Sequence, residues 1–431
     1  MNIVQVTPGA GGMYCGNCFR DNALVAELRR QGHSTLMVPL YLPMTLEEPD
    51  QSAGTPLFFG GISVYLEQKS ALFRNMPGWL RNALAAPALL KWAAGRAAKT
   101  QAADVGELTI SMLRGEDGRQ ASELATLIAW LKTQPRPDVI CLSNALLVGM
   151  ARQLRAELGA PVFSLLQGED SFLDAMREPQ RAVAWELMAE RAREVACFIT
   201  PSHYFANRMR DRLRVAPAQI QVLPSGVNLQ DFPTTPAGSP QPPVLGFFAR
   251  QCKDKGLDLL VDAFLELRRR QRVPELRLKI GGGCGPADTA FVAVQKRKLE
   301  RAGLLASVEF HPNVDRQAKI EFLRSLTVFS VPALYGEAFG LYLVEAMAAG
   351  VPVVQPRVAA FPEIIEATGG GELAEPTAIG LAEAIERLLL DPARCQMLAR
   401  QGQRAAHAKY STPQMARELT ALFQAHGVAG V

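Results

Sequence analysis

The chain has 431 residues, more than one ordinary hydrophobic core accommodates, so two or three domains are expected. Apolar residues make up 48% and charged residues 20%, a balance that excludes a disordered chain, and a net charge of +4 is too small to indicate a nucleic-acid partner. No apolar run reaches membrane-spanning length, no secretory leader pattern opens the chain, and the seven cysteines, an odd number, indicate thiols in a reducing compartment. We therefore expect a cytoplasmic globular protein.

The first half alternates between strand and helix patterns. A buried strand is predicted at 3–6, a helix at 22–30 after a glycine-rich turn, and a second strand at 34–38. The alternation continues with a strand at 137–144, a helix at 145–158, and strand-containing stretches at 161–167 and 191–202. Strands joined by helical crossovers predict an α/β fold with a doubly wound parallel sheet.

A helical insertion is predicted at 43–120, between these strand units. Its segment 72–99 is apolar and basic, with Trp79 and Trp92 among lysines and arginines. A helix lying in a membrane surface has this composition, and so does a helical pair that caps an acceptor groove. A helix covering the domain core is the commoner source of such a pattern. Peripheral contact with the inner membrane face therefore stays open as a hypothesis.

A proline-rich stretch at 233–243 breaks the pattern and reads as a hinge. It separates an N-terminal domain, 1–232, from a second α/β domain, 244–408, and a final helical segment, 409–431, is expected to pack back toward the N-terminal domain. Strands are predicted in the second domain at 243–250, 276–282, 308–314, 326–332 and 351–356. Two such domains would enclose a cleft, and open α/β sheets bind ligands beyond the carboxyl ends of their strands.

The loop and helix after the strand at 326–332 carry the strongest functional signal. Glu337 stands in the loop and Glu345 on the helix, with seven residues between them. The amides of Phe339, Gly340 and Leu341 would open that helix, and a helix start is a ready site for an anion. Glu345 could reach a sugar diol, and Glu337 could face a group attached to the phosphates.

Two cations near the start of the same domain complement this loop. Arg250 and Lys255 follow the strand at 243–250 and precede a helix. Lone basic residues in loops are usually only solvated, but two cations at a strand's carboxyl end suit a diphosphate. Together the two elements predict a nucleotide-diphosphate site.

These motifs resemble the retaining glycosyltransferases of family 4, or group 1, which have the GT-B fold of two Rossmann-like domains. The resemblance rests on Arg250, Lys255 and the Glu337–Glu345 spacing, and on the segments "VLPSGVNLQDF" and "FPEII". It implies that Arg250 and Lys255 bind the donor pyrophosphate, that Glu345 binds the ribose and that Glu337 contacts the donor sugar. It also implies that the loop at Asn313 and Val314 touches the base through its backbone.

The glycine turn at the start of the chain gains a role from the same resemblance. Gly11 and Gly12 would approach the donor phosphate and the acceptor. Cys15 and Cys18 would then begin the next helix or line the acceptor side, together with Asn17. A four-cysteine cluster of Cys15, Cys18, Cys252 and Cys284, for redox chemistry or metal, is the alternative. No second C-x-x-C or H-x3-5-H supports it, so no metal site is predicted.

The pattern departs from the family on the acceptor side. Many relatives carry a histidine where this chain has Gln167, which can hydrogen-bond a sugar but cannot act as an acid or base at neutral pH. Asp170 is a candidate for binding the acceptor, and a helix N-cap is the plainer interpretation of Asp170. The resemblance therefore does not identify the sugar or the acceptor.

The resemblance predicts a retaining hexosyltransferase that moves a sugar from a UDP- or GDP-sugar to an unidentified acceptor hydroxyl. No D-x-D-like metal dyad stands in a suitable loop, so metal-independent transfer without any cofactor is expected, with Arg250, Lys255 and the helix start offsetting the charge of the leaving group. Two alternatives remain. One is a non-catalytic nucleotide-sugar-binding protein, and the other is a sugar epimerase or phosphorylase on the same fold.

Overall fold

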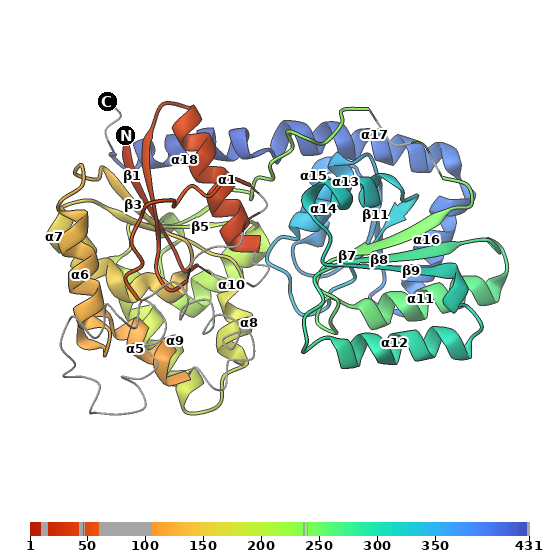
Figure 1. Cartoon of the computed structure of the whole chain (residues 1–431), viewed down its shortest axis with the longest axis horizontal. Helices are drawn as coiled ribbons and strands as arrows, with labels where there is room; N and C mark the ends of the chain where they lie inside the picture. The colour runs from red at the N-terminus through yellow and green to blue at the C-terminus, as the bar shows by residue number, and fades with distance from the viewer. Residues whose placement is uncertain are drawn as a thin grey trace. The chain divides into compact units, whose positions relative to one another are not determined.

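The computed structural model describes residues 1–9, 16–42, 46, 48–59, 106–235, 238 and 240–428. They form two compact units, shown in Figure 1. Unit 1 comprises Met1–Pro201, Phe205–Leu223 and Met415–Val431, and unit 2 comprises Ser202–Tyr204 and Pro224–Gln414. The chain passes from one unit to the other at Leu223, before the proline-rich stretch 233–243.

Unit 1 is built on a parallel sheet of six strands in the order β2-β1-β3-β4-β5-β6. The strands are β1 (Asn2–Thr7), β2 (Ser34–Pro39), β3 (Val139–Leu142), β4 (Val162–Leu165), β5 (Cys197–Thr200) and β6 (Ile220–Val222). Every residue of β3, β4 and β5 is buried, as expected for strands covered on both faces. The predicted doubly wound parallel sheet is confirmed.

Helices cover this sheet. They are α1 (Gly16–Arg30), α5 (Gly106–Arg114), α6 (Ala121–Leu131), α7 (Ala151–Leu158), α8 (Glu169–Asp174), α9 (Gln180–Arg191), α10 (His203–Leu213) and α18 (Thr412–Ala425). Most of the insertion predicted at 43–120, including the segment 72–99, lies outside the described residues. The membrane-contact hypothesis therefore stays a prediction. Among the helices that the structure describes, none is both long and apolar enough to cross a bilayer.

The last helix, α18, completes the core of unit 1. Leu419 and Phe423 are fully buried in the same cluster as Leu24 and Leu28 of α1. The ring of Phe423 meets that of Phe163 on β4 edge to face, with centroids 4.8 Å apart. The C-terminal segment thus supplies apolar surface that the sheet of unit 1 buries.

Unit 2 has a second parallel sheet of six strands, in the order β12-β11-β10-β7-β8-β9. The strands are β7 (Val244–Phe248), β8 (Arg277–Gly282), β9 (Val308–Pro312), β10 (Val328–Phe329), β11 (Val353–Pro356) and β12 (Gly371–Ala374). Read from β9, this is the Rossmann order, with a switch point between β7 and β10 where the connections leave in opposite directions. Val328 pairs with Leu245 and Phe329 with Gly246 across that point.

Helices lie on both faces of the second sheet. They are α11 (Leu257–Arg270), α12 (Thr289–Arg301), α13 (Arg316–Arg324), α14 (Leu341–Ala348), α15 (Phe361–Thr368), α16 (Ala378–Leu390) and α17 (Pro392–Lys409). In Figure 1, α11 and α12 lie on one face of the sheet, and α13, α14 and α15 on the other. The sheet is therefore covered on both faces, and its loops at the carboxyl ends of the strands are left to form a site.

Candidate functional site

The candidate site lies in unit 2, at the switch point of its sheet. Arg250 and Lys255 follow β7, and the loop 332–340 follows β10. Because β7 and β10 are hydrogen-bonded neighbours and run parallel, their following loops leave the same edge of the sheet side by side. Sequence alone could place each loop at a strand end, but only the strand order makes them neighbours.

The two loops touch at Gly256. This residue precedes α11 with a left-handed backbone, φ 73°. A Cβ atom added there would stand 2.1 Å from the carbonyl oxygen of Pro332, at the start of the other loop. Since only glycine combines this backbone with so close an approach, Gly256 sets the distance between the loop of Lys255 and that of Glu337.

Lys255 and Glu337 form the centre of a closed hydrogen-bond network. The ammonium of Lys255 lies 2.5 Å from Oε2 of Glu337 and 2.6 Å from the hydroxyl of Tyr335. Tyr335 and Tyr342 also donate to that carboxylate oxygen, at 2.6 and 2.9 Å. The ammonium stands 5.0 and 5.4 Å from the centroids of the two phenol rings, within reach of a cation–π attraction.

The network fixes the protonation of its members. Burial raises the pKa of the Glu337 carboxyl, but the charge of Lys255 and the three hydrogen bonds outweigh burial and hold this pKa below its ordinary value. Burial and the neighbouring carboxylate raise the pKa values of Tyr335 and Tyr342. Glu337 is therefore an anion, and both phenols are donors, at neutral pH.

Arg250 is held by a carboxylate that the sequence did not single out. Its Nε and Nη2 lie 3.0 and 2.9 Å from oxygens of Asp288, which precedes α12. This pairing raises the pKa of the guanidinium. The Arg250 side chain is 60% exposed whereas that of Asp288 is 7% exposed. Asp288 thus holds the guanidinium through Nε and Nη2. The N–H groups of Nη1 are then in position to donate to a ligand.

Gly340 ends the loop and opens α14. Its backbone is left-handed, with φ 102°, and Leu341 is the first residue of the helix. Phe339 is buried, with its ring 5.8 Å from that of Tyr410, so it anchors the turn through the core. The amide of Leu343 donates to the carbonyl of Gly340 at 2.9 Å, and the amides that precede it at this helix start are suited to an anion.

Glu345 lies one turn into α14 and is paired with a lysine. Nζ of Lys319, on α13, is 2.9 Å from Oε1 of Glu345. Both side chains are largely buried, at 11% and 17% exposure. Lys319 therefore fixes where this carboxylate stands, and a ribose that binds Glu345 would approach Lys319 as well.

Asn313 links the loop after β9 to the loop after β8. It has a left-handed backbone, with φ 54°, directly after β9, and its amide N–H donates to the carbonyl of Gly282 at the end of β8. Its side chain accepts from the N–H of Cys284 and donates to the carbonyl of the same residue, at 2.9 and 3.1 Å. Asn313 and Val314 are thus part of a braced pair of loops at the edge of the sheet that carries Arg250.

The acceptor-side residues lie in unit 1. The side chain of Gln167, after β4, donates to the carbonyl of Ser143, after β3. Asp170 is buried and bonded to Arg208. The N-cap interpretation of Asp170 is wrong: α8 begins at Glu169 with Gly168 as its cap, because the positive φ of Gly168 turns the chain into the helix. Asn17 stands in the first turn of α1, half-exposed, and Gly11 and Gly12 lie outside the described residues.

Glu169, rather than Asp170, organises this loop. Its carboxylate accepts from the amides of Ala145, Gln167 and Gly168, at 2.9, 2.8 and 3.0 Å. Burial raises the pKa of Glu169 despite these bonds. The bonds tie the loop after β3 to the loop after β4, so Glu169 determines where Gln167 is presented.

The described residues contain no cluster of the four cysteines Cys15, Cys18, Cys252 and Cys284. Cys15 lies outside the described residues, and Cys18 is buried on α1. Burial raises the pKa values of the Cys252 and Cys284 thiols, so both are protonated at neutral pH. Within the described ranges, no group of three histidine, cysteine or carboxylate side chains is arranged to hold a metal ion.

Sequence reasoning missed four residues of the unit 2 site: Tyr335, Tyr342, Asp288 and Lys319. Tyr335 and Tyr342 flank Glu337 in the chain, and Asp288 follows the carboxyl end of β8, so proximity to known positions could have flagged these three. Lys319 comes from the middle of α13 and carries no local signal. Its pairing with Glu345 depends on how α13 packs beside α14.

Comparison with known families agrees with this geometry. The family "Glycosyl transferases group 1" matches residues 235–405, and "Glycosyltransferase Family 4" matches residues 95–231. The chain belongs to the group 1 glycosyltransferases. The predicted family is confirmed, and the two matches together cover most of unit 2 and about half of unit 1.

Individual relatives of this group 1 glycosyltransferase are distant. The lipopolysaccharide core biosynthesis mannosyltransferase LpsB of Rhizobium meliloti is 29% identical over 188 residues, which are 42% of this chain and 51% of LpsB. A D-inositol 3-phosphate glycosyltransferase of Streptomyces griseus is 31% identical over 224 residues, 45% of this chain and 46% of the relative. The chain thus spans about half the length of the curated relatives it matches.

A solved structure of a neighbour shows the same fold. HepE of Anabaena, crystallised with UDP, superposes with a TM-score of 0.65 at 16% identity, over 99% of this chain and all of the neighbour. At this identity the likeness shows the fold alone. The GT-B class, with two six-stranded parallel sheets, is therefore confirmed.

Proposed function

We propose that this chain is a retaining glycosyltransferase that moves a hexose from a UDP- or GDP-sugar to an acceptor hydroxyl, without a metal ion. The observation that supports it most is the contact of Lys255 with Glu337, which joins the loops after β7 and β10 at the switch point of the sheet. Family membership and the UDP bound to HepE point to the same donor class.

The diphosphate of the donor would lie over Arg250, Lys255 and the first turn of α14. Each charge-assisted hydrogen bond contributes about 1.5–3 kcal/mol. Arg250 can offer its Nη1 edge while Asp288 keeps the guanidinium in place. The ammonium of Lys255 is already paired with the carboxylate of Glu337. A bound phosphate would therefore share this ammonium with Glu337.

In the transfer, the bond between the anomeric carbon and the leaving phosphate oxygen breaks, and a bond to the acceptor oxygen forms on the same face. The acceptor proton passes to the leaving phosphate. Glu337 is a poor nucleophile because Lys255, Tyr335 and Tyr342 all stabilise its charge. We therefore assign Glu337 to orienting the sugar, and the cations to stabilising the leaving pyrophosphate.

Thermal melting with UDP, GDP and ADP tests the donor site, followed by mass spectrometry of a panel of nucleotide sugars for hydrolysis or transfer. Arg250→Ala and Lys255→Ala should each abolish the rise in melting temperature. Lys253→Ala is the matched control, because Lys253 is an exposed cation of the same loop and should bind normally. A wild-type protein whose melting temperature no nucleoside diphosphate raises would refute the proposal.

Retention and metal independence have their own readouts. The anomeric configuration of the product, read by nuclear magnetic resonance, should match that of the donor. Transfer should continue at an unchanged rate after exhaustive treatment with EDTA. An inverted product or a rate lost with EDTA and restored by a divalent cation would contradict that part of the proposal.

A further inference from the structure

Unit 2 contains a cavity that is separate from the candidate donor site. Its volume is about 650 Å³. Leu326 and Thr327, which line it, directly precede β10, and Gly350 and Pro352 stand just before β11. The donor loops follow the carboxyl ends of β7 and β10, so the cavity lies at the opposite edge of the same parallel sheet. It cannot belong to the site built by those loops.

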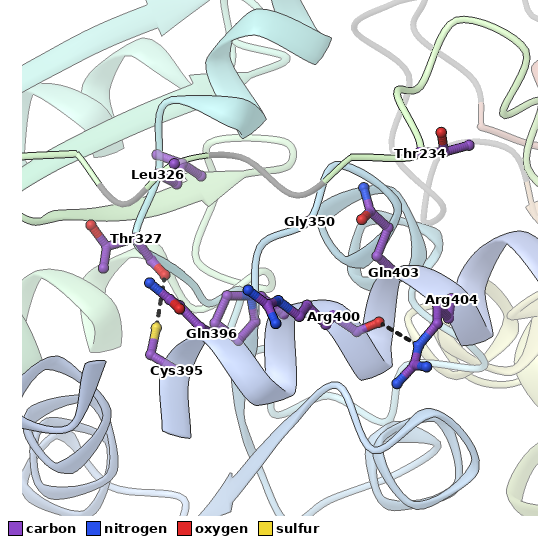
Figure 2. A pocket seen from close by; sticks show the side chains of 12 residues that line it. Thr234, Leu326, Thr327, Gly350, Cys395, Gln396, Arg400, Gln403 and Arg404 are labelled. Atoms are coloured by element: carbon purple, nitrogen blue, oxygen red, sulfur yellow. Dashed lines mark hydrogen bonds between the residues drawn. The ribbon is translucent and has the colours of Figure 1, made fainter. Parts of the chain in front are cut away.

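One wall of the cavity is a face of α17. Figure 2 shows the side chains of Gln396, Arg400 and Arg404 on this helix, with Thr327 and Gly350 across from them. Apolar atoms from Leu326, Pro352 and other residues complete the lining. The lining therefore mixes polar and apolar atoms, and a volume of several hundred Å³ is in the range of small-molecule sites.

The charged residues among those described in the lining are all basic. They are Arg400 and Arg404, and no described lining residue is acidic. Among the described residues, neither Arg400 nor Arg404 is ion-paired, and Nε of Arg404 makes only a 3.4 Å hydrogen bond to the carbonyl oxygen of Arg400. By contrast, Arg394 on the same helix is paired with Glu372 at 2.6 Å.

Arg400 and Arg404 are four residues apart, so they lie on the same face of α17, and an anion bound between them would offset the weak repulsion of their charges. A guanidinium matches a phosphate with two parallel N–H···O bonds, so Arg400 and Arg404 could grip one phosphoryl group from two sides. The amide of Gln396 and the hydroxyl of Thr234, which also line the cavity, could donate to further oxygens.

The neighbouring thiol does not offer chemistry of its own. Cys395 is buried, and its Sγ lies 3.6 Å from the carbonyl oxygen of Thr327. Burial raises the pKa of this thiol to about 11, so it is protonated at neutral pH. The cavity is therefore suited to binding rather than to covalent modification.

We propose that this cavity is a second ligand site, which binds a small phosphorylated molecule through Arg400 and Arg404. The phosphoryl group lies against the two guanidiniums, and the organic part occupies the space lined by Leu326 and Pro352. The site is independent of the donor site and does not depend on the proposed transferase activity.

Calorimetric titration with inorganic pyrophosphate and with glycerol 3-phosphate tests the site. Since pyrophosphate would also bind the donor loops, the titration uses a chain that carries Arg250→Gln and Lys255→Gln. Binding at one site should persist in this chain. Adding Arg400→Gln and Arg404→Gln should weaken it on the order of tenfold or more, and Arg400→Lys with Arg404→Lys should weaken it less, because the charge remains without the planar fork.

The matched control is Arg297→Gln with Arg301→Gln, two exposed arginines at the same spacing on α12, which should leave the affinity unchanged. Circular dichroism and thermal melting first check that the chain with Arg250→Gln and Lys255→Gln is folded, and the further arginine substitutions should leave its spectrum and melting temperature unchanged because all four arginines are exposed. Equal affinity in the Arg400 and Arg404 variants, or no binding once Arg250 and Lys255 are replaced, would overturn the proposal. Neither result bears on whether the donor loops bind a nucleotide.

Discussion

Replacing Lys255 with methionine tests whether the ion pair holds the candidate site together. Methionine keeps the aliphatic stem between Tyr335 and Tyr342 but leaves the Glu337 carboxylate with two phenol donors and no cation. Removing one partner of a fully buried pair costs about 3–5 kcal/mol of unfolding free energy. Since the side chains of Lys255 and Glu337 keep 22% and 15% exposure, we expect the lower end, about 3 kcal/mol.

A double-mutant cycle separates the charge from the packing. Glu337→Gln in the Lys255→Met background removes the uncompensated charge, so the double variant should be more stable than Lys255→Met alone, although it should not bind nucleotide. Urea denaturation combined with hydrogen exchange, read by mass spectrometry on peptides from β7 and α14, reports the stability of unit 2. If the second substitution restores nothing, the account of a charge left buried without a partner is wrong.

The loss of unfolding free energy in Lys255→Met should also depend on pH. In the wild type the pKa of Glu337 lies below its unfolded value, so its contribution is present above the unfolded pKa and is lost as pH falls through the folded pKa. Without Lys255, burial dominates and raises the pKa of folded Glu337 above its unfolded value. The variant then loses stability as pH rises from the unfolded pKa to the folded pKa of Glu337. The deficit of Lys255→Met should therefore be smaller at about pH 5 than at about pH 7. An equal deficit at both would refute the reasoning.

Three further substitutions test single contacts. Tyr342→Phe removes one donor to a buried carboxylate and should lower the unfolding free energy by about 1.5 kcal/mol, measured by urea denaturation. Asp288→Asn should raise the dissociation constant for a nucleoside diphosphate by about tenfold in calorimetry, because Arg250 loses the charge that orients it, while the melting temperature changes little. Gly256→Ala should unfold more readily than its control, Gly32→Ala: both have a positive φ, which costs about 1–2 kcal/mol with a side chain, but only the first meets a backbone carbonyl. Equal melting temperatures for the two alanine variants would count against the close contact of the loops.

Most of the fold and the choice of functional elements followed from local sequence. Buried strands such as β3 and β7 are short apolar runs, and the helices between them have apolar faces at helical spacing, so alternation alone predicted the two parallel sheets. Arg250, Lys255 and Glu337 each lie in a loop that follows a strand, and Glu345 lies one turn into the helix after such a loop. Strand ends are where an α/β sheet presents its ligand-binding loops.

Other features depended on contacts between residues distant in the chain. The bonds from Lys255 to Glu337, from Arg250 to Asp288 and from Lys319 to Glu345 each join separate loops or helices, and no periodicity encodes such partners. The cavity beside α17 has the same origin, since its walls come from the amino ends of β10 and β11 and from a helix that follows both in the chain. Backbone hydrogen bonding in helices and the spacing of apolar residues act over a few residues. The sequence itself therefore determined the helices and strands, and which charged side chains each of their loops carries. Which charges meet, and which remain unpaired, was decided only when the strands took their order and the helices packed on the sheet.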